Sequence, residues 1–181
     1  MAAVRPLLND YTILHFATHA AFVTGAPEDS FILFGNGDTP TLRDIEAWSL
    51  SNVDLVVLSA CETGVGGLGN GEEILGLGYQ FQLSGAQAVM ASLWQVNDQA
   101  TQILMATFYA ALNQGHSKAE ALRQAQTALI TGDFALLAGS DRGLTVLAAD
   151  GLPTAPASTR AVATLEHPYF WAAFILIGNG Q

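Results

Sequence analysis

Apolar residues gather in three short runs, each ending in small or polar residues. Runs of this length that are apolar at nearly every position are typical of parallel strands covered on both faces. We therefore predict strands at Thr12–Thr18, Asp54–Ala60 and Gln87–Trp94. A fourth run, Phe170–Ile177, ends at a Gly-Asn-Gly sequence.

Segments with helical spacing of apolar residues lie between these runs. We predict helices at Leu42–Trp48, capped by Thr41 with Asp44, at Glu72–Leu83, at Asp98–Asn113 with Gly115 as a stop, and from the capping box Ser117/Glu120 to about Ile130. Strands that alternate with helices predict an α/β fold with a mainly parallel sheet. The stretch Gly132–Glu166 reads as a long loop, with one further strand at Leu144–Ala148.

Composition narrows the class of protein. The 181 residues are enough for one domain, and six Lys and Arg against sixteen Asp and Glu give a net charge of −10. Such a chain is repelled by nucleic acid and by anionic membrane surfaces, so we expect neither as a partner. The single cysteine excludes an internal disulfide. No signal-peptide core and no apolar stretch of about 18–20 residues is evident, and we expect a soluble cytoplasmic protein.

Two reactive residues follow predicted strands. His19 comes after the first strand and Cys61 after the second. In open parallel sheets, ligands bind beyond the carboxyl ends of the strands. If the two strands are neighbours, an imidazole and a thiol face one crevice, which is the arrangement of a nucleophilic cysteine and its base. The Gly-rich turn after Cys61 can offer backbone N–H groups to an oxyanion.

The structural alternatives are simple. A lone cysteine at a strand end is often a small buried apolar residue, and a lone histidine often satisfies a local hydrogen bond. Position alone therefore leaves the roles of His19 and Cys61 open. We interpret His15 as a core residue, His116 as solvated and His167 as structural.

Two other kinds of site are disfavoured. Gly64–Gly69 matches the G-x-G-x-x-G dinucleotide pattern. The motif does not directly follow the strand, and the ribose-binding carboxylate about 20 residues later is missing. No metal-ligand spacing is present beyond His15 and His19, which lack a third ligand. We expect no cofactor and no metal.

Three carboxylates are candidates for a specificity pocket. They are Asp98, Glu62 and Glu72. Asp98 has a competing structural role, since it opens a helix and suits an N-cap, alone or shared with Asn97, and we favour that role.

Several sequence blocks resemble a known family. The strings ILHFATHA (13–20), VVLSACETG (56–64), GEEILGL (71–77), AVMASLWQVND (88–98) and HPYFWAAFILIGN (167–179) are similar to those of the CHAT family, caspase-like domains often found beside tetratricopeptide repeats. The blocks span nearly the whole chain. The resemblance implies a three-layer caspase-like sandwich and a cysteine endopeptidase with His19 and Cys61 as its dyad. The backbone N–H groups of residue 20 and Cys61 would bind the oxyanion.

Two positions depart from the family pattern. The family has Gly after the catalytic His, where this chain has Ala20, and it commonly has Gly-Glu-Gly where this chain has Gly71-Glu72-Glu73. Ala keeps the N–H but loses the backbone angles open only to glycine. The alternative to a peptidase is therefore a catalytically silent module that binds a protein partner.

The resemblance also implies that strands before the His19 strand are missing. We expect residues 1–181 to form a single, partial CHAT domain whose sheet is completed by a tetratricopeptide-repeat region, by another chain or by self-association. A protein or peptide is the expected substrate. The acidic candidate pocket favours a basic residue before the scissile bond.

Overall fold

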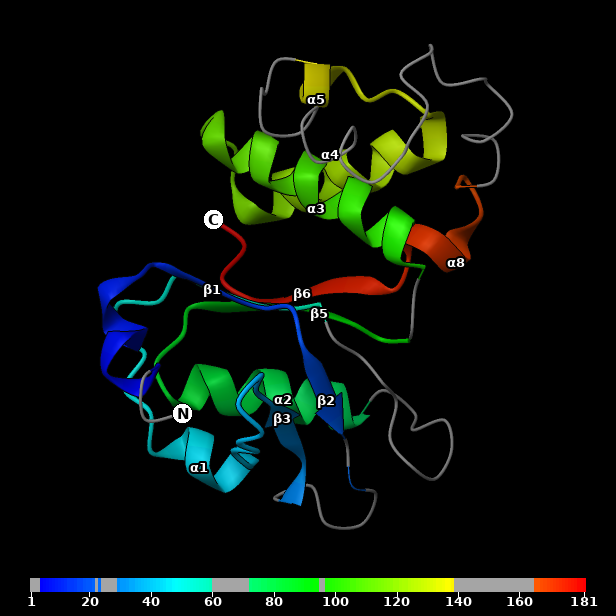
Figure 1. The fold of residues 1–181 in the computed structure, drawn as a ribbon. Helices are drawn as coiled ribbons and strands as arrows, with labels where there is room; N and C mark the ends of the chain where they lie inside the picture. The colour runs from blue at the N-terminus through cyan, green and yellow to red at the C-terminus, as the bar shows by residue number, and fades with distance from the viewer. Residues whose placement is uncertain (1–3, 22, 24–28, 60–71, 95–96, 139–164) are drawn as a thin grey trace. The chain divides into compact units, whose positions relative to one another are not determined.

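The computed structural model describes residues 4–21, 23, 29–59, 72–94, 97–138 and 165–181. These residues form two compact units, one of Met1–Gln95 with Phe174–Asn179 and one of Val96–Ala173 with Gly180–Gln181 (Figure 1). Each unit is described by itself. The expectation of a single domain over residues 1–181 remains a prediction.

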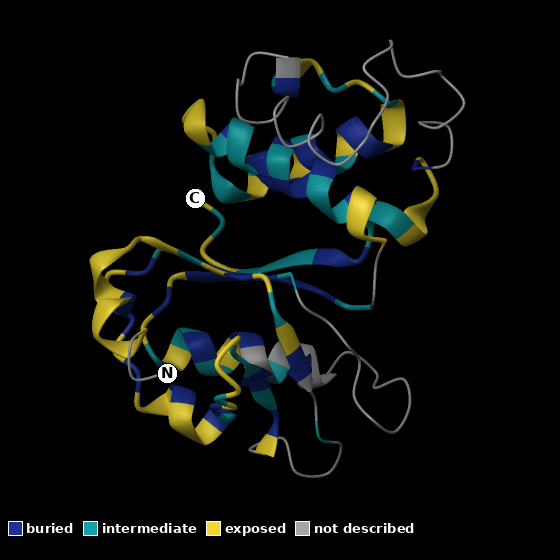
Figure 2. Cartoon of the chain, viewed as in Figure 1, coloured by how far each residue is buried: buried dark blue, intermediate teal, exposed yellow. Residues whose placement is uncertain are grey.

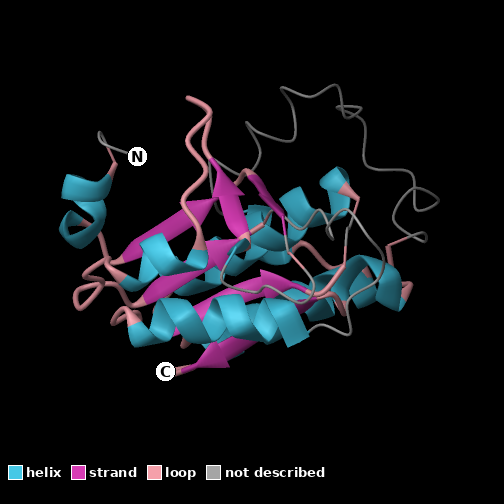
Figure 3. Ribbon diagram, turned by 90° about the horizontal axis from the view of Figure 1, so that it is seen from below, coloured by secondary structure: helices cyan, strands magenta, loops and turns pink. Residues whose placement is uncertain are grey.

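The first unit is built on a four-stranded sheet. Its strands are β1 (Ile13–Phe16), β4 (Leu55–Leu58), β5 (Ala88–Ser92) and β6 (Phe174–Gly178), in the order β1-β4-β5-β6. The pairs β1/β4 and β4/β5 are parallel, whereas β6 runs antiparallel to β5 (Figure 3). The predicted α/β class with a mainly parallel sheet is confirmed.

The fourth apolar run divides between two elements. Its first residues belong to a short helix, α8 (Pro168–Trp171), and only its second half forms β6. His167 caps this helix, since its Nδ1 accepts a hydrogen bond from the Tyr169 N–H at 3.2 Å. The His167 cap and Pro168 at the first helical position favour a helix here, so β6 begins only after α8.

Two helices cover one face of the sheet, α1 (Leu42–Glu46) and α2 (Glu72–Leu83). Between them and the sheet lies an aromatic cluster, in which the rings of Phe16 and Trp48 lie 6.0 Å and 6.1 Å from that of Phe81. Every residue of β4 and β5 is buried, as Figure 2 shows in dark blue. This burial explains why every residue of the two strands except Ser92 is apolar.

Local signals set the helix ends of this unit. The predicted capping box is present at α1, where the Thr41 N–H donates to Asp44 Oδ2 at 2.9 Å and the Asp44 N–H donates to Thr41 Oγ1 at 3.3 Å. The Asp44 carboxylate accepts from both the N–H and the hydroxyl of Thr41, each at 2.9 Å, and these two bonds lower the pKa of Asp44. After α2 the chain turns at Gly85, whose φ of +113° favours glycine and where a Cβ would lie 2.9 Å from the Ser51 nitrogen.

A second, two-stranded sheet was not predicted. It pairs β2 (His19–Ala21) with β3 (Phe31–Leu33) in antiparallel fashion. A 3₁₀ helix, η1 (Arg5–Asp10), precedes β1 and was also missed. Strands of three residues and a 3₁₀ helix of six carry too little periodicity to be recognised in a sequence.

The second unit consists of helices, with α3 (Asp98–Asn113) packed against α4 (Lys118–Thr131). Both bounds agree with the prediction. A short helix, α5 (Ala135–Ala138), lies near the start of the stretch Gly132–Glu166. The expectation that this stretch is an irregular loop was therefore wrong for these residues. The predicted strand at Leu144–Ala148 falls outside the described residues.

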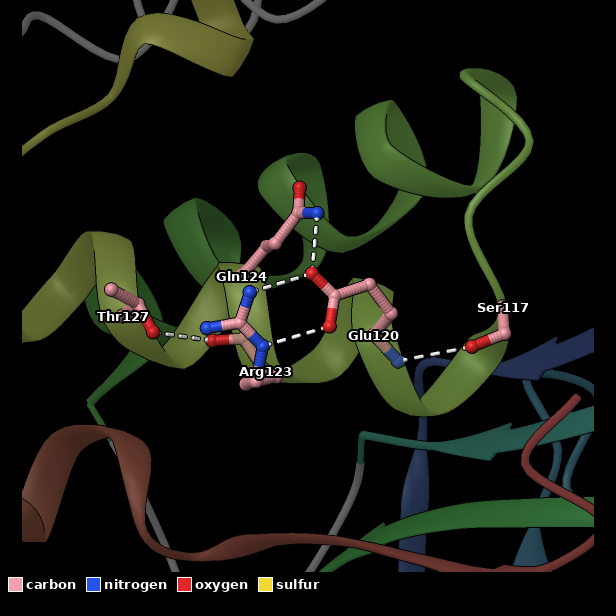
Figure 4. A network of polar contacts seen from close by, with 5 residues as sticks. All are labelled: Ser117, Glu120, Arg123, Gln124 and Thr127. Atoms are coloured by element: carbon pink, nitrogen blue, oxygen red, sulfur yellow. Dashed lines mark hydrogen bonds and ion pairs between the residues drawn. The ribbon is translucent and has the colours of Figure 1, made fainter.

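A polar network stabilises the first turns of α4 (Figure 4). Ser117 Oγ accepts from the Glu120 N–H at 3.3 Å, which is one half of the predicted capping box. The Glu120 carboxylate accepts from Arg123 Nε at 2.7 Å and Nη2 at 2.6 Å, and from Gln124 Nε2 at 2.8 Å. These bonds, those of Arg123 first, lower the pKa of Glu120 to about 2.

This network predicts a pH dependence of stability. Because the pKa of Glu120 in the folded chain lies below its ordinary value of 4.5, its contribution is complete above that value and is lost as the pH falls toward about 2. Urea unfolding of the native chain and of Glu120→Gln should therefore differ most near neutrality and converge over this pH window. Arg123→Gln should abolish most of the difference. Parallel curves down to the acid end would contradict the prediction.

Candidate functional site

The strands that precede the two candidate catalytic residues are neighbours. Strands β1 and β4 pair in parallel, with Ile13 opposite Leu55 and Phe16 opposite Leu58. The Ser59 N–H donates to the Phe16 carbonyl oxygen at 3.3 Å and extends the ladder by one bond. The carboxyl ends of both strands therefore lie at the same edge of the sheet, as the sequence analysis required for a shared crevice.

His19 lies just past this edge. It is the first residue of β2 and is exposed. Its position is set by the turn after β1, in which the Thr18 hydroxyl donates a hydrogen bond to the Leu33 carbonyl oxygen. Cys61 lies outside the described residues, three positions beyond the end of β4.

The backbone at Ala20 is extended and buried. Its partner Ile32 donates its N–H to the Pro40 carbonyl oxygen at 3.1 Å, on the side of β3 away from β2. Because hydrogen-bonded and non-hydrogen-bonded pairs alternate along an antiparallel ladder, the Ala20 N–H also points away from β3. No described residue other than glycine has a positive φ, so Ala20 requires none of the glycine-only angles.

Of the three candidate carboxylates, only Asp98 has a side chain within the described part of the structure. Asp98 is the exposed first residue of α3. The cap is Asn97, whose Oδ1 accepts from the Gln99 N–H at 3.0 Å and from the Ala100 N–H at 3.2 Å. The preference for Asp98 as the cap was wrong, because Asn97 holds the extended backbone that the position needs (ψ of 134°).

The side chains of the two other candidate carboxylates, Glu72 and Glu62, lie outside the described part of the structure. Glu72 is the first residue of α2, and its side chain lies outside the described part of the structure. Glu62 falls among the residues that are not described, as does the Gly64–Gly69 motif.

His15 was interpreted as a core residue, and this was wrong. It is exposed, because it shares with Ile13 the face of β1 opposite to Leu14 and Phe16, which pack in the core. Its Nε2 lies 2.9 Å from Ser59 Oγ, in a hydrogen bond between the ends of β1 and β4. Partial burial of the ring lowers the pKa of His15.

Sequence reasoning did not single out Ser59. The signal was available, because Ser59 is a polar residue at the end of an apolar strand and stands two positions before the candidate nucleophile. The expectations for the remaining histidines hold, since His116 is exposed after α3 and His167 caps α8.

The part of the chain that the structure describes shows neither a metal-binding cluster nor a membrane-spanning helix. There, no group of three His, Cys, Asp or Glu side chains is arranged to hold a metal ion. None of the helices in that part of the chain combines the length and the apolar character needed to cross a bilayer.

Comparison with known proteins bears on the family. No curated protein shows significant similarity to this chain. The family model described as "CHAT domain" matches residues 1–179, which is nearly the whole chain and includes His19, Cys61 and both strands that precede them. Together with the mixed α/β fold and its mainly parallel sheet, this match shows that the chain belongs to the CHAT domain family, a caspase-like family.

Proposed function

We propose that this chain is a caspase-like cysteine endopeptidase in which His19 is the general base and Cys61 the nucleophile. The observation that carries the proposal is the register of β1 and β4. It pairs each residue of β1 with the residue of β4 that stands 42 positions later (Ile13 with Leu55, Phe16 with Leu58). His19 and Cys61 are likewise 42 positions apart, three positions past the last pair of the ladder.

The register of β1 and β4 supports a dyad because it brings the ends of the two strands side by side. Parallel neighbours deliver the residues that follow them to the same edge of the sheet, which supports a site shared by His19 and Cys61. A histidine beside a cysteine lowers the pKa of the thiol and shuttles its proton. Family membership supports the same two roles, because the blocks that match include both residues.

The reaction uses the two side chains of the dyad, backbone N–H groups and one water molecule. The His19 imidazole removes the proton from Cys61, and the thiolate attacks the peptide carbonyl carbon. Backbone N–H groups of Ala20 and Cys61 stabilise the oxyanion. The C–N bond then breaks, His19 returns its proton to the leaving amine, and a thioester remains. Water, deprotonated by His19, hydrolyses the thioester to a carboxylic acid and regenerates the thiol.

The dyad predicts the effect of two substitutions. Cys61→Ala and His19→Ala should each lower kcat for peptide cleavage by roughly a thousandfold or more, and the double variant should be no slower than either single one. Unfolding free energies should stay within about 1 kcal/mol of the native value. The readout is cleavage of a fluorogenic peptide library.

The matched control is His116→Ala, which removes another exposed histidine and should leave cleavage unchanged. Full activity of Cys61→Ala would overturn the mechanism. A native chain that is folded but neither cleaves peptides nor reacts with a thiol-directed peptide probe would instead be a silent caspase-like binding module.

Charge leads to a proposal for substrate specificity. Between Arg43 and Lys118 the chain holds no Lys or Arg, whereas the candidate pocket residues of the first unit, Glu62 and Glu72, are acidic. Asp98 lies in the second unit, where Asn97 caps α3, so its place in the pocket stays a prediction. We therefore propose that the chain prefers Lys or Arg before the scissile bond.

A peptide library tests this preference. Glu62→Gln should reduce the ratio of kcat/KM for basic over apolar residues by about tenfold, because the carboxylate next in sequence to the proposed nucleophile is lost. The control Asp10→Asn, at the exposed end of η1, should not change the ratio. Preferred cleavage after Asp would refute the proposal.

The sheet edge leads to a proposal for partners. Strand β1 stands at the edge of the four-stranded sheet, and Ile13 is 38% exposed there. An apolar edge strand is a template for pairing with a further strand. We propose that a strand from a second chain, either another copy or a partner such as a tetratricopeptide-repeat protein, pairs with β1 and completes the active form.

Light scattering coupled to size exclusion tests this point. The native chain should form a dimer, or remain a weakly active monomer that a partner activates. Ile13→Lys should abolish the dimer or the activation, because a charged edge blocks strand pairing. Tyr79→Lys, at an exposed position of α2, is the control. A monomer with full peptidase activity would show that β1 needs no further strand.

A further inference from the structure

A cross-strand hydrogen bond joins the two strands that carry the proposed dyad. His15 Nε2 on β1 lies 2.9 Å from Ser59 Oγ, one residue past the end of β4. A neutral imidazole has one donor and one acceptor nitrogen, and a hydroxyl can do either, so the bond forms in both tautomers. Such a distance is that of a normal hydrogen bond.

The place of this bond in the fold suggests what it does. Side chains of a strand alternate between faces, and Leu14 and Phe16 face the core under α1 and α2, so His15 lies on the other face. His15 and Ser59 stand four and two positions before His19 and Cys61. Within the described residues, the last backbone bond between the two strands runs from the Ser59 N–H to the Phe16 carbonyl oxygen at 3.3 Å. The His15–Ser59 bond therefore links the carboxyl ends of β1 and β4 and acts as a clamp between them. His19 and Cys61 follow these two strands in the sequence.

We propose that His15 and Ser59 are positioning residues for the peptidase reaction: their hydrogen bond holds the carboxyl ends of β1 and β4 together and sets the separation of the His19 imidazole and the Cys61 thiol. This inference rests on the proposed function. Neither residue touches substrate. Each acts through the strand end that it fixes, and a misplacement of about 1 Å can cost as much as a hundredfold in rate.

A simpler role for the pair would be to stabilise the fold. The two roles differ in their readouts. A clamp that only stabilises the sheet changes the unfolding free energy and leaves the properties of Cys61 unchanged once the chain is folded. A clamp that positions the dyad lowers kcat more than it changes KM, and it slows the alkylation of Cys61 because the thiol loses part of its contact with His19.

The experiment uses the full chain, in which Cys61 is the only cysteine, so that alkylation by iodoacetamide reports this residue alone. His15→Ala and Ser59→Ala should each lower kcat by between about tenfold and about a hundredfold with little change in KM, and should slow alkylation several-fold. The double variant should be no slower than either single variant, because the two residues act as one unit. His15→Gln and Ser59→Thr keep a hydrogen-bonding group in place and should restore kcat to within about twofold of the native value.

The matched control is Gln87→Ala, which removes the 2.8 Å bond from Gln87 Nε2 to Asp54 Oδ1 at the opposite end of the same sheet. It should change neither kcat nor alkylation. If His15→Ala and Ser59→Ala lower stability but leave both rates at the native value, the positioning role is refuted. If the native chain shows no cleavage and His19→Ala leaves the alkylation rate unchanged, the proposed function fails, and the positioning role fails with it.

Discussion

The parallel pairing of β1 with β4 is the constraint on which the rest of the molecule depends. Its register brings residues about 42 positions apart in the chain to the same level of one sheet, and it turns two distant sequence blocks into neighbours. Parallel strands need a crossover between them, and α1 lies in the crossover from β1 to β4. The helices α1 and α2 then cover the face that carries Leu14 and Phe16. The candidate site lies where the ladder ends.

Side chains alternate along β1, so the two faces of this strand make different contacts. The core face is stabilised by apolar and aromatic contacts, such as those of Phe16 with Phe34 and Phe81, whose ring centroids lie 5.8 Å and 6.0 Å from its own. The opposite face carries His15, whose hydrogen bond with Ser59 links β1 to the end of β4. A single strand thus combines the burial that holds the sheet together with a polar contact close to the proposed chemistry.

The family of the chain is shown, whereas its activity is a proposal. Membership in the CHAT domain family rests on a match over residues 1–179, but a fold can host active and silent sites alike. For this chain, the replacement of the family's glycine by Ala20 was the main sequence argument for a silent module. The extended backbone of Ala20, with its N–H directed away from β3, removes the conformational part of that argument.

The sequence by itself determined the elements whose signals are local. Continuous apolar runs predicted β1, β4 and β5, and the capping residues Thr41 and Ser117 predicted where two helices begin. It also supplied His19 and Cys61 as candidates, because a reactive residue after a buried strand is visible in the chain. Only the tertiary structure decided that β1 and β4 are neighbours, that Asn97 rather than Asp98 caps α3, and that His15 is exposed and bonded to Ser59. Strand order, register and the exposure of an edge strand depend on contacts between residues far apart in the chain, and no local pattern records which of the possible pairings buries the most apolar surface.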